Sequence, residues 1–174
     1  FIYKPSPHLL SSIIKYQNKK YKIEDFKLET VWNSQIKPKD FEKLNNFFWF
    51  FSLDLKSSKK SVQEVILNWI NKNNKFKRES WKFNITAKRI ISWLSYHQLS
   101  YDESDKEYRS MFDHMIQKQT NHLLYEIKNS KDLENKIIGC SAIILAGLCY
   151  KIEKNYLDVG LSFLKKITNA SIDN

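Results

Sequence analysis

The sequence predicts an all-α fold built from antiparallel helical hairpins. The 174 residues, of which 42% are apolar, include only 3 Gly and 3 Pro. These are too few turn-forming residues for a many-stranded sheet. Apolar residues also recur at helical spacing through most of the chain. Short loops between the expected helices, of about 4 to 10 residues, would make consecutive helices antiparallel neighbours. The length suits one domain with a sizeable core.

The chain divides into an N-terminal arm and a helical domain. Residues 1–36 form the expected arm, in which two prolines interrupt regular structure near the start. Within it, residues 9–16 could form a short helix, and residues 21–31 alternate loosely as an extended segment does. Residues 37–174 form the expected helical domain.

Two amphipathic helices are expected at the start of that domain. The first begins at Pro38, a residue suited to a first helical turn, and its apolar positions are Phe41, Leu44, Phe47, Phe48, Phe51 and Leu55. Ser61 and Glu64 have the spacing of a capping box and would open the second helix. Its apolar stripe consists of Val62, Val65, Ile66, Trp69 and Ile70.

The third and fourth helices contain the less common side chains. Asn84 is a suitable N-cap for the third, which carries Arg89 and Trp93 one turn apart. Taken alone, this pair is more often part of an amphipathic helix with a snorkelling Arg than a site. The fourth helix would begin at Asp102 or Ser104. Its stripe, more often core than groove, is Tyr108, Met111, Phe112, Met115, Ile116, Gln119 and Leu123.

Two further helices complete the domain. Residues 133–150 are apolar nearly all round from Ile137 onward, which predicts a central helix buried on most sides. Gly139 and Gly147 in it would let another helix approach closely. A sixth helix over residues 156–167 would cover it.

The charge of the chain suggests an anionic partner other than nucleic acid. The net charge is +10, and of the 29 Lys and Arg only Arg78, Arg89 and Arg109 are Arg. Proteins that read nucleic acid depend on Arg for bidentate contacts, so we predict no nucleic-acid partner. An acidic polysaccharide would satisfy the same electrostatics. No apolar run reaches the roughly 18 to 20 residues of a membrane span, so no membrane partner is predicted either.

Cysteine and histidine residues suggest no cofactor. Cys140 and Cys149 lie nine apart on one expected helix, too far for a disulfide, and are interpreted as core thiols. This usage is compatible with either the periplasm or the cytoplasm. No histidine lies in a metal-binding motif, so no metal and no other cofactor is predicted. His114 and His122 could share a face, although a helix histidine is more often satisfied by a neighbour.

The order of the aromatic and apolar segments resembles the N-terminal helical region of bacterial heparinase II/III-like proteins, which are mostly polysaccharide lyases or uncharacterised relatives. The resemblance runs from about Trp32 to Asn174. It is carried by residues 47–51, 65–70, 81, 87–94, 119–123, 142–150 and 160–164. It implies that the helical hairpins curve into a partial, incomplete α/α toroid whose concave side holds a sugar.

The resemblance also implies a function. Family lyases cleave uronate-containing polysaccharides by β-elimination: the substrate carboxylate is neutralised, and a Tyr or His then removes the adjacent proton. The family's Tyr and principal His would lie beyond Asn174, so we expect the missing C-terminal part of the chain to be a partner. This segment would then lack a complete catalytic centre, which leaves its status as an enzyme open. The alternative is a non-catalytic helical module of the same ancestry that binds a glycan or a protein.

Candidate site residues follow from this alignment. Asn135 matches the Asn of a family Asn-His pair and is the catalytic candidate, but Lys136 replaces the His and favours the non-catalytic alternative. Arg89 either neutralises a substrate carboxylate or sulfate, or pairs with an acidic residue of an adjacent helix. Asn121-His122 repeats the dipeptide, yet its place at a helix end favours a structural role. The substrate-binding candidates are Trp81, Arg89, Trp93 and His122, the Trp rings being suited to stack on sugars.

Overall fold

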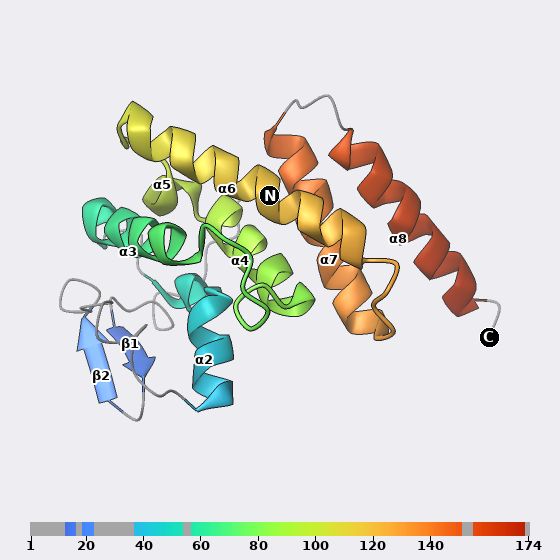
Figure 1. Ribbon diagram of the computed structural model, residues 1–174, viewed down its shortest axis with the longest axis horizontal. Helices are drawn as coiled ribbons and strands as arrows, with labels where there is room; N and C mark the ends of the chain where they lie inside the picture. The colour runs from blue at the N-terminus through green and yellow to red at the C-terminus, as the bar shows by residue number, and fades with distance from the viewer. Residues whose placement is uncertain (1–12, 17–18, 23–36, 54–56, 151–154, 173–174) are drawn as a thin grey trace.

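The computed structural model describes residues 13–16, 19–22, 37–53, 57–150 and 155–172, and most of them are helical (Figure 1). The expected all-α class is confirmed, with one small addition. Strands β1 (Ile13–Tyr16) and β2 (Lys19–Lys22) pair antiparallel, with Ile13 opposite Lys22. Strand β1 replaces the second half of the expected helix over residues 9–16, because the inter-strand ladder satisfies its backbone groups. Residues 9–12 and 23–31 lie outside the described residues.

The expected first helix of the domain is two elements, not one. Helix α2 (Pro38–Asn45) ends at a sharp turn, and the 3₁₀-helix η3 (Phe48–Ser52) follows. At the turn, Phe47 has a left-handed backbone with φ 57°, and the Asn46 side-chain oxygen accepts the Phe48 N–H at 2.9 Å. The continuous helix was therefore a wrong prediction. The turn places the rings of Phe47 and Phe50 in the core, where both are fully buried.

Helix α3 (Lys59–Asn73) begins earlier than the capping box predicted. Its N-cap is Ser58, whose hydroxyl oxygen accepts the Ser61 N–H at 3.2 Å. Ser61 therefore lies in the first turn and not before it. The predicted apolar stripe is confirmed, because its members are buried: Val62, Val65, Ile66, Trp69 and Ile70.

Helices α4 (Phe83–Ser95), α5 (His97–Ser100) and α6 (Lys106–Glu126) form the middle of the fold. The short α5 was not predicted. The N-cap of α6 is Asp105, whose carboxylate accepts the Tyr108 N–H at 2.7 Å, so both earlier candidates for its start were wrong. The stripe on α6 is core as predicted, with only Met111 less than fully buried.

Helices α7 (Leu133–Cys149) and α8 (Tyr156–Ile172) lie side by side and run antiparallel (Figure 1). Their glycines allow close approach, as expected. A Cβ added at Gly147 would lie 2.4 Å from the Leu157 backbone nitrogen, and one at Gly160 would lie 2.7 Å from Ile144. At Gly139 the nearest atom would be the tip of the Phe83 ring on α4, at 2.3 Å.

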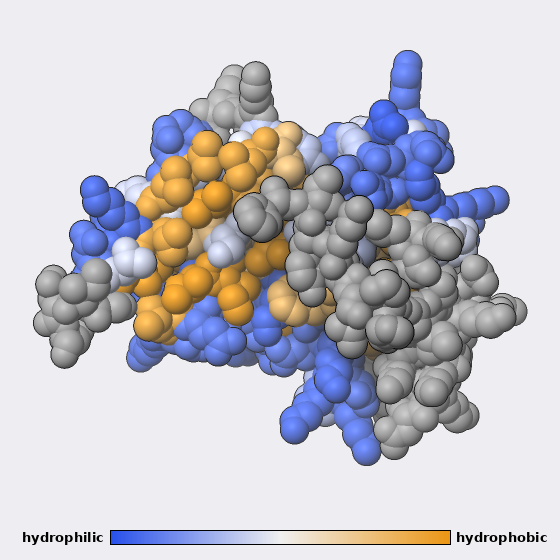
Figure 2. All heavy atoms as spheres, turned by 180° about the vertical axis from the view of Figure 1, so that it is seen from behind, coloured by the Kyte–Doolittle hydropathy of each residue, from blue (hydrophilic) through white to orange (hydrophobic). Residues whose placement is uncertain are grey.

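Helix α7 is not buried on most sides, which corrects a prediction. Leu133, Ile137 and Leu148 are 47%, 41% and 65% exposed. They recur along one side of α7, and Val159 and Leu161 add exposed apolar surface on α8. Figure 2 shows apolar side chains gathered on the rear face at the side of the molecule that α7 and α8 occupy. Within the described ranges, no helix combines the length and apolar character that crossing a bilayer requires.

Candidate functional site

Arg89 and Trp93 lie in the core, so neither offers a surface to a polysaccharide. Both side chains are completely buried. The Trp93 ring contacts those of Phe47 and Phe112, with centroids 5.2 and 5.5 Å apart, and the Arg89 guanidinium lies 3.8 Å from the centroid of the Trp69 ring. Their assignment as substrate-binding residues is corrected, because the helix face that carries them packs inward.

The partners of Arg89 explain why a charged side chain is buried. Its guanidinium donates to the carbonyl oxygens of Asn45 at 2.8 Å and Ser80 at 3.1 Å, to Gln119 Oε1 at 2.8 Å and to Thr86 Oγ1 at 3.3 Å. All four acceptors are neutral, so the expected pairing with an acidic residue is not what is found. Burial lowers the pKa of Arg89 well below its usual range. Arg89 thus ties the end of α2, the segment before α4, and α6 together.

Trp81 and His122, from different elements, are brought into contact. His122 Nε2 lies 2.8 Å from the Trp81 carbonyl oxygen, and the two ring centroids are 5.6 Å apart. Trp81 is 2% exposed, whereas His122 is half-buried. Asn121, next to it, accepts a hydrogen bond from the Tyr156 hydroxyl at 3.1 Å. Both members of the Asn121-His122 dipeptide therefore make contacts within the fold, as the structural interpretation expected.

Phe76 is the exposed aromatic residue beside this contact, and sequence reasoning had not selected it. Its ring is 62% exposed and lies 6.1 Å from that of Trp81 and 5.4 Å from that of His122. Lys118 Nζ lies 5.9 Å from the Trp81 ring. We call this region the basic aromatic surface and define it as Lys72, Lys75, Phe76, Lys77, Trp81, His114, Lys118 and His122.

A hollow of about 410 Å³ forms part of the basic aromatic surface, between the end of α3 and the middle of α6. It is lined by Ile70, Asn74, Lys75, Met111, His114, Met115 and Lys118. Lys118 Nζ donates to the Asn74 carbonyl, and Lys77 Nζ donates to that of Lys72 at 2.6 Å. Burial lowers the pKa of Lys72, and the charge of Lys77 lowers it further. Positive charge is thus crowded here, which favours an anionic ligand.

Asn135, the catalytic candidate, lies in the first turn of α7. Its side-chain nitrogen donates to Asp132 Oδ2 at 2.7 Å, and Asp132 caps the same helix by accepting the Glu134 N–H at 3.0 Å. Asn135 is half-buried. The hydrogen bond of Asn135 therefore stabilises the start of α7. None of the described contacts of Asn135 is with a substrate-binding candidate.

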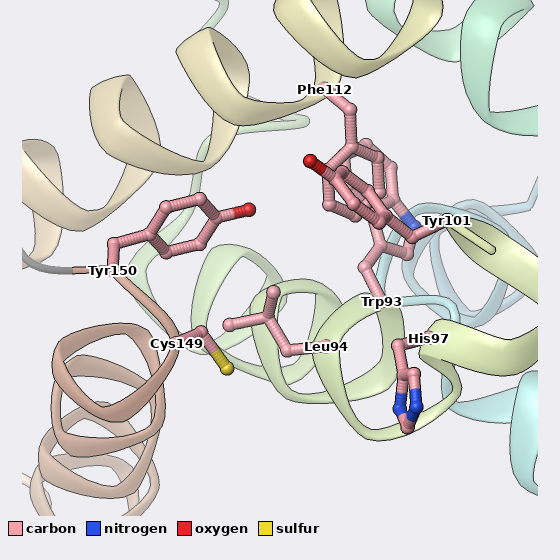
Figure 3. Close-up of a pocket in the computed structure, with 7 residues that line it drawn as sticks. All are labelled: Trp93, Leu94, His97, Tyr101, Phe112, Cys149 and Tyr150. Carbon is pink, nitrogen blue, oxygen red and sulfur yellow. The ribbon is translucent and has the colours of Figure 1, made fainter. Parts of the chain in front are cut away.

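A separate pocket of about 220 Å³ opens between α4, α5, α6 and the end of α7 (Figure 3). It is lined by Trp93, Leu94, His97, Tyr101, Phe112, Cys149 and Tyr150. Of the predicted site residues, it contains only Trp93, as part of a wall. Cys149 is exposed here, which corrects its interpretation as a core thiol, whereas Cys140 is buried as expected. Burial raises the pKa of both thiols.

Two tyrosines at this pocket share one carboxylate. The hydroxyls of Tyr101 and Tyr150 donate to the two oxygens of Asp113, at 3.0 and 2.8 Å. Burial raises the pKa of both tyrosines, and the hydrogen bond and negative charge of Asp113 raise it further. At the rim, His97 Nε2 lies 4.0 Å from Asp102 Oδ2. The described residues contain no cluster of three His, Cys, Asp or Glu side chains with the geometry of a metal site.

The residues that sequence reasoning missed had weak signals. Phe76 is an aromatic residue in a run of Asn and Lys that follows the stripe of α3, and Asp113 is a single acid beside the apolar stripe of α6. Neither Phe76 nor Asp113 lies in a recognisable sequence motif. Tyr101 and Tyr150 come into contact with Asp113 only in the folded structure. Comparison with known proteins supplies no further guide: no family model, no curated protein and no solved structure matches this chain.

Proposed function

We propose that this chain is the helical region of a heparinase II/III-like protein and that it binds an acidic, uronate-containing polysaccharide at the basic aromatic surface. The observation that carries the proposal is the exposed ring of Phe76, which contacts the rings of Trp81 and His122 and lies between Lys75 and Lys77 in the sequence. The exposed face of such a ring suits the apolar face of a pyranose. The neighbouring lysines suit the carboxylates or sulfates on the same sugars.

The contacts of the other candidates favour binding over cleavage by this chain. Arg89 donates to four acceptors of the fold, so it is not free to neutralise a substrate carboxylate. Tyr101 and Tyr150 have raised pKa values, which disfavours the phenolate form that a proton-abstracting Tyr requires. Cleavage would therefore depend on groups other than Arg89, Tyr101 and Tyr150.

The proposal includes the arrangement of the helices as part of an incomplete α/α toroid. Its support is the packing of consecutive helices: α6 packs on α7, and α7 packs antiparallel on α8, while α7 also packs on α4. Connections of only a few residues join them, as in stacked helical hairpins.

A second candidate function is a non-catalytic module that binds a protein. The exposed apolar side chains of α7 and α8 favour it, because a contiguous apolar patch often marks an interaction site (Figure 2). The two functions predict binding at different places: a glycan on the basic aromatic surface, and a protein on α7 and α8.

The test is titration of heparin and polygalacturonate into the protein, followed by calorimetry at low and high salt. We expect Phe76→Leu and Lys118→Ala each to weaken binding roughly fivefold to tenfold, because one removes the ring and the other a charge. Lys165→Ala is the matched control: it removes an exposed charge on α8 and should leave the affinity unchanged.

The outcomes separate the alternatives. Equal losses for Lys118→Ala and Lys165→Ala would mean that binding follows net charge alone, and the site would be wrong. Absence of binding to either polysaccharide would contradict the proposal and favour the protein-binding candidate. Ultraviolet absorbance of the unsaturated uronate, followed in the same samples, would reveal cleavage by this chain and contradict a purely binding role.

A further inference from the structure

The pocket of Figure 3 is lined mainly by aromatic side chains and by no lysine, and it shares no residue with the basic aromatic surface. Four of its seven lining residues are aromatic: Trp93, Tyr101, Phe112 and Tyr150. The Phe112 ring lies 5.5 Å from that of Trp93 and 5.3 Å from that of Tyr101, so these three form a continuous wall. None of the lining residues is Lys or Arg.

Asp113 gives this aromatic wall a negative charge. It accepts one hydrogen bond on each carboxylate oxygen, from Tyr101 at 3.0 Å and from Tyr150 at 2.8 Å. Figure 3 shows the two hydroxyl oxygens directed toward each other from opposite sides of the pocket. A phenol that donates to a carboxylate is more electron-rich, which strengthens the attraction of its ring for a cation.

We propose that this pocket binds the quaternary ammonium group of a small organic cation about the size of choline. Aromatic rings beside a carboxylate attract a positive charge, and the apolar walls suit methyl groups. A primary ammonium fits less well, because its three N–H donors need acceptors and none of the seven lining residues carries a carboxylate.

The size and surroundings of the pocket agree with such a ligand. A cavity of about 150 Å³ holds benzene, so about 220 Å³ accommodates a trimethylammonium group and a short chain. The exposed side chains of His97 and Cys149 mark the open side, where the chain would leave. Arg109 is the nearby opposing charge: it lies 5.2 Å from the Tyr101 ring but outside the lining of the pocket.

The test compares choline with 3,3-dimethylbutan-1-ol, its uncharged isostere, by calorimetric titration of the intact chain. We expect choline to bind at least roughly tenfold more tightly than the isostere, because the two differ only in charge. Equal affinities would show a merely apolar pocket, and no binding of choline at millimolar concentration would show no site. Either result overturns the proposal.

Variants locate the site. Asp113→Asn keeps the shape of the side chain but removes its charge, and we expect it to weaken choline binding roughly tenfold while leaving the isostere unchanged. Glu107→Gln makes the same charge change at an exposed position of the same helix and should have little effect. Equal effects of the two variants would place the cation elsewhere. Circular dichroism confirms that each variant is folded.

Discussion

The aromatic core and the α7–α8 hairpin are held together in different ways. The aromatic core consists of Phe47, Phe50, Trp69, Trp93 and Phe112, and the Arg89 guanidinium packs on the ring of Trp69. The core depends on large rings from four elements and on hydrogen bonds that the Arg89 guanidinium donates to the end of α2, to the segment before α4 and to α6. The hairpin instead depends on glycines that bring two backbones together, and its outer side keeps apolar residues exposed.

The difference teaches that conspicuous residue types do not indicate function by themselves. Trp93 and Arg89 stand out in the sequence but serve the core, where both are completely buried. Phe76, which stands out less, is exposed at the surface, and Tyr150 lines a pocket in which buried Trp93 is part of the wall. Substitutions can test the comparison, because each region should respond to a different kind of change.

The largest effect should come from Arg89→Met. This substitution fills much of the volume but leaves the carbonyls of Asn45 and Ser80 without their buried donor, and each unsatisfied group costs about 1 to 3 kcal/mol. We expect a loss of roughly 3 to 6 kcal/mol in the free energy of unfolding, measured by urea denaturation. Arg89→Lys should recover only part of it, because one ammonium cannot reach acceptors on three elements. A neutral result for Arg89→Met would contradict its role as a tie.

Trp93→Ala tests the packing of the core without its polar network. The side chain is fully buried against other rings, so its removal should lower the free energy of unfolding by about 3 to 5 kcal/mol. The same denaturation experiment measures it. A loss below about 1 kcal/mol would show that Trp93 faces an open cleft, as the polysaccharide-binding interpretation required.

In the hairpin, Gly147→Ala and Gly139→Ala form a matched pair. At Gly147 the new Cβ would meet the Leu157 backbone, which cannot move without separating the helices, so we expect a loss of about 1 to 3 kcal/mol. At Gly139 it would meet the movable tip of the Phe83 ring, and the better helix propensity of Ala offsets the strain to within about 1 kcal/mol. Thermal unfolding of both variants would show whether backbone contact sets the difference.

The hydrogen bond from Tyr150, at the end of α7, to Asp113 on α6 should make the free energy of unfolding sensitive to alkaline pH. Burial, then the hydrogen bond and charge of Asp113, raise the pKa of Tyr150 above its value of about 10 in the unfolded chain. The resulting stability is fully present below about pH 10 and is lost as the pH rises, because the unfolded state then releases a proton that the folded state keeps.

Tyr150→Phe removes this dependence at one site. We expect it to cost about 1 kcal/mol near pH 7, from the lost hydrogen bond to Asp113, and less at pH 11. Urea denaturation at both values provides the measurement. The same loss at both pH values would mean that Tyr150 does not titrate differently in the folded and unfolded states.

The smallest effect is expected at the outer face of the hairpin. Leu148 is 65% exposed, so Leu148→Ser should change the free energy of unfolding by less than about 0.5 kcal/mol. Ala146→Ser, at a completely buried position two residues before Leu148 and on the opposite side of α7, is the contrasting control and should be clearly destabilising. A large loss for Leu148→Ser in denaturation would show that its face is covered in the folded protein.

Helical periodicity determined which residues face inward. The stripes of α3 and α6 are buried as predicted, and the glycines of α7 allow the close approach expected of them. Element boundaries were predicted less well. The first helix of the domain breaks at Phe47, because the Asn46 side-chain oxygen accepts the Phe48 N–H and the Asn45 carbonyl oxygen accepts from Arg89. The second of these contacts spans 44 residues.

The sequence by itself determined an all-α class and the buried stripes of α3 and α6, because the spacing of apolar residues along a single helix sets which of its faces is buried. Only the tertiary structure decided the sites. Arg89 and Trp93 became core because other helices cover their face, whereas Phe76 meets His122, and Tyr101 meets Tyr150 through Asp113, across elements distant in sequence. The physical reason is that a site needs side chains from several elements at contact distance, and local periodicity carries no information on which elements meet.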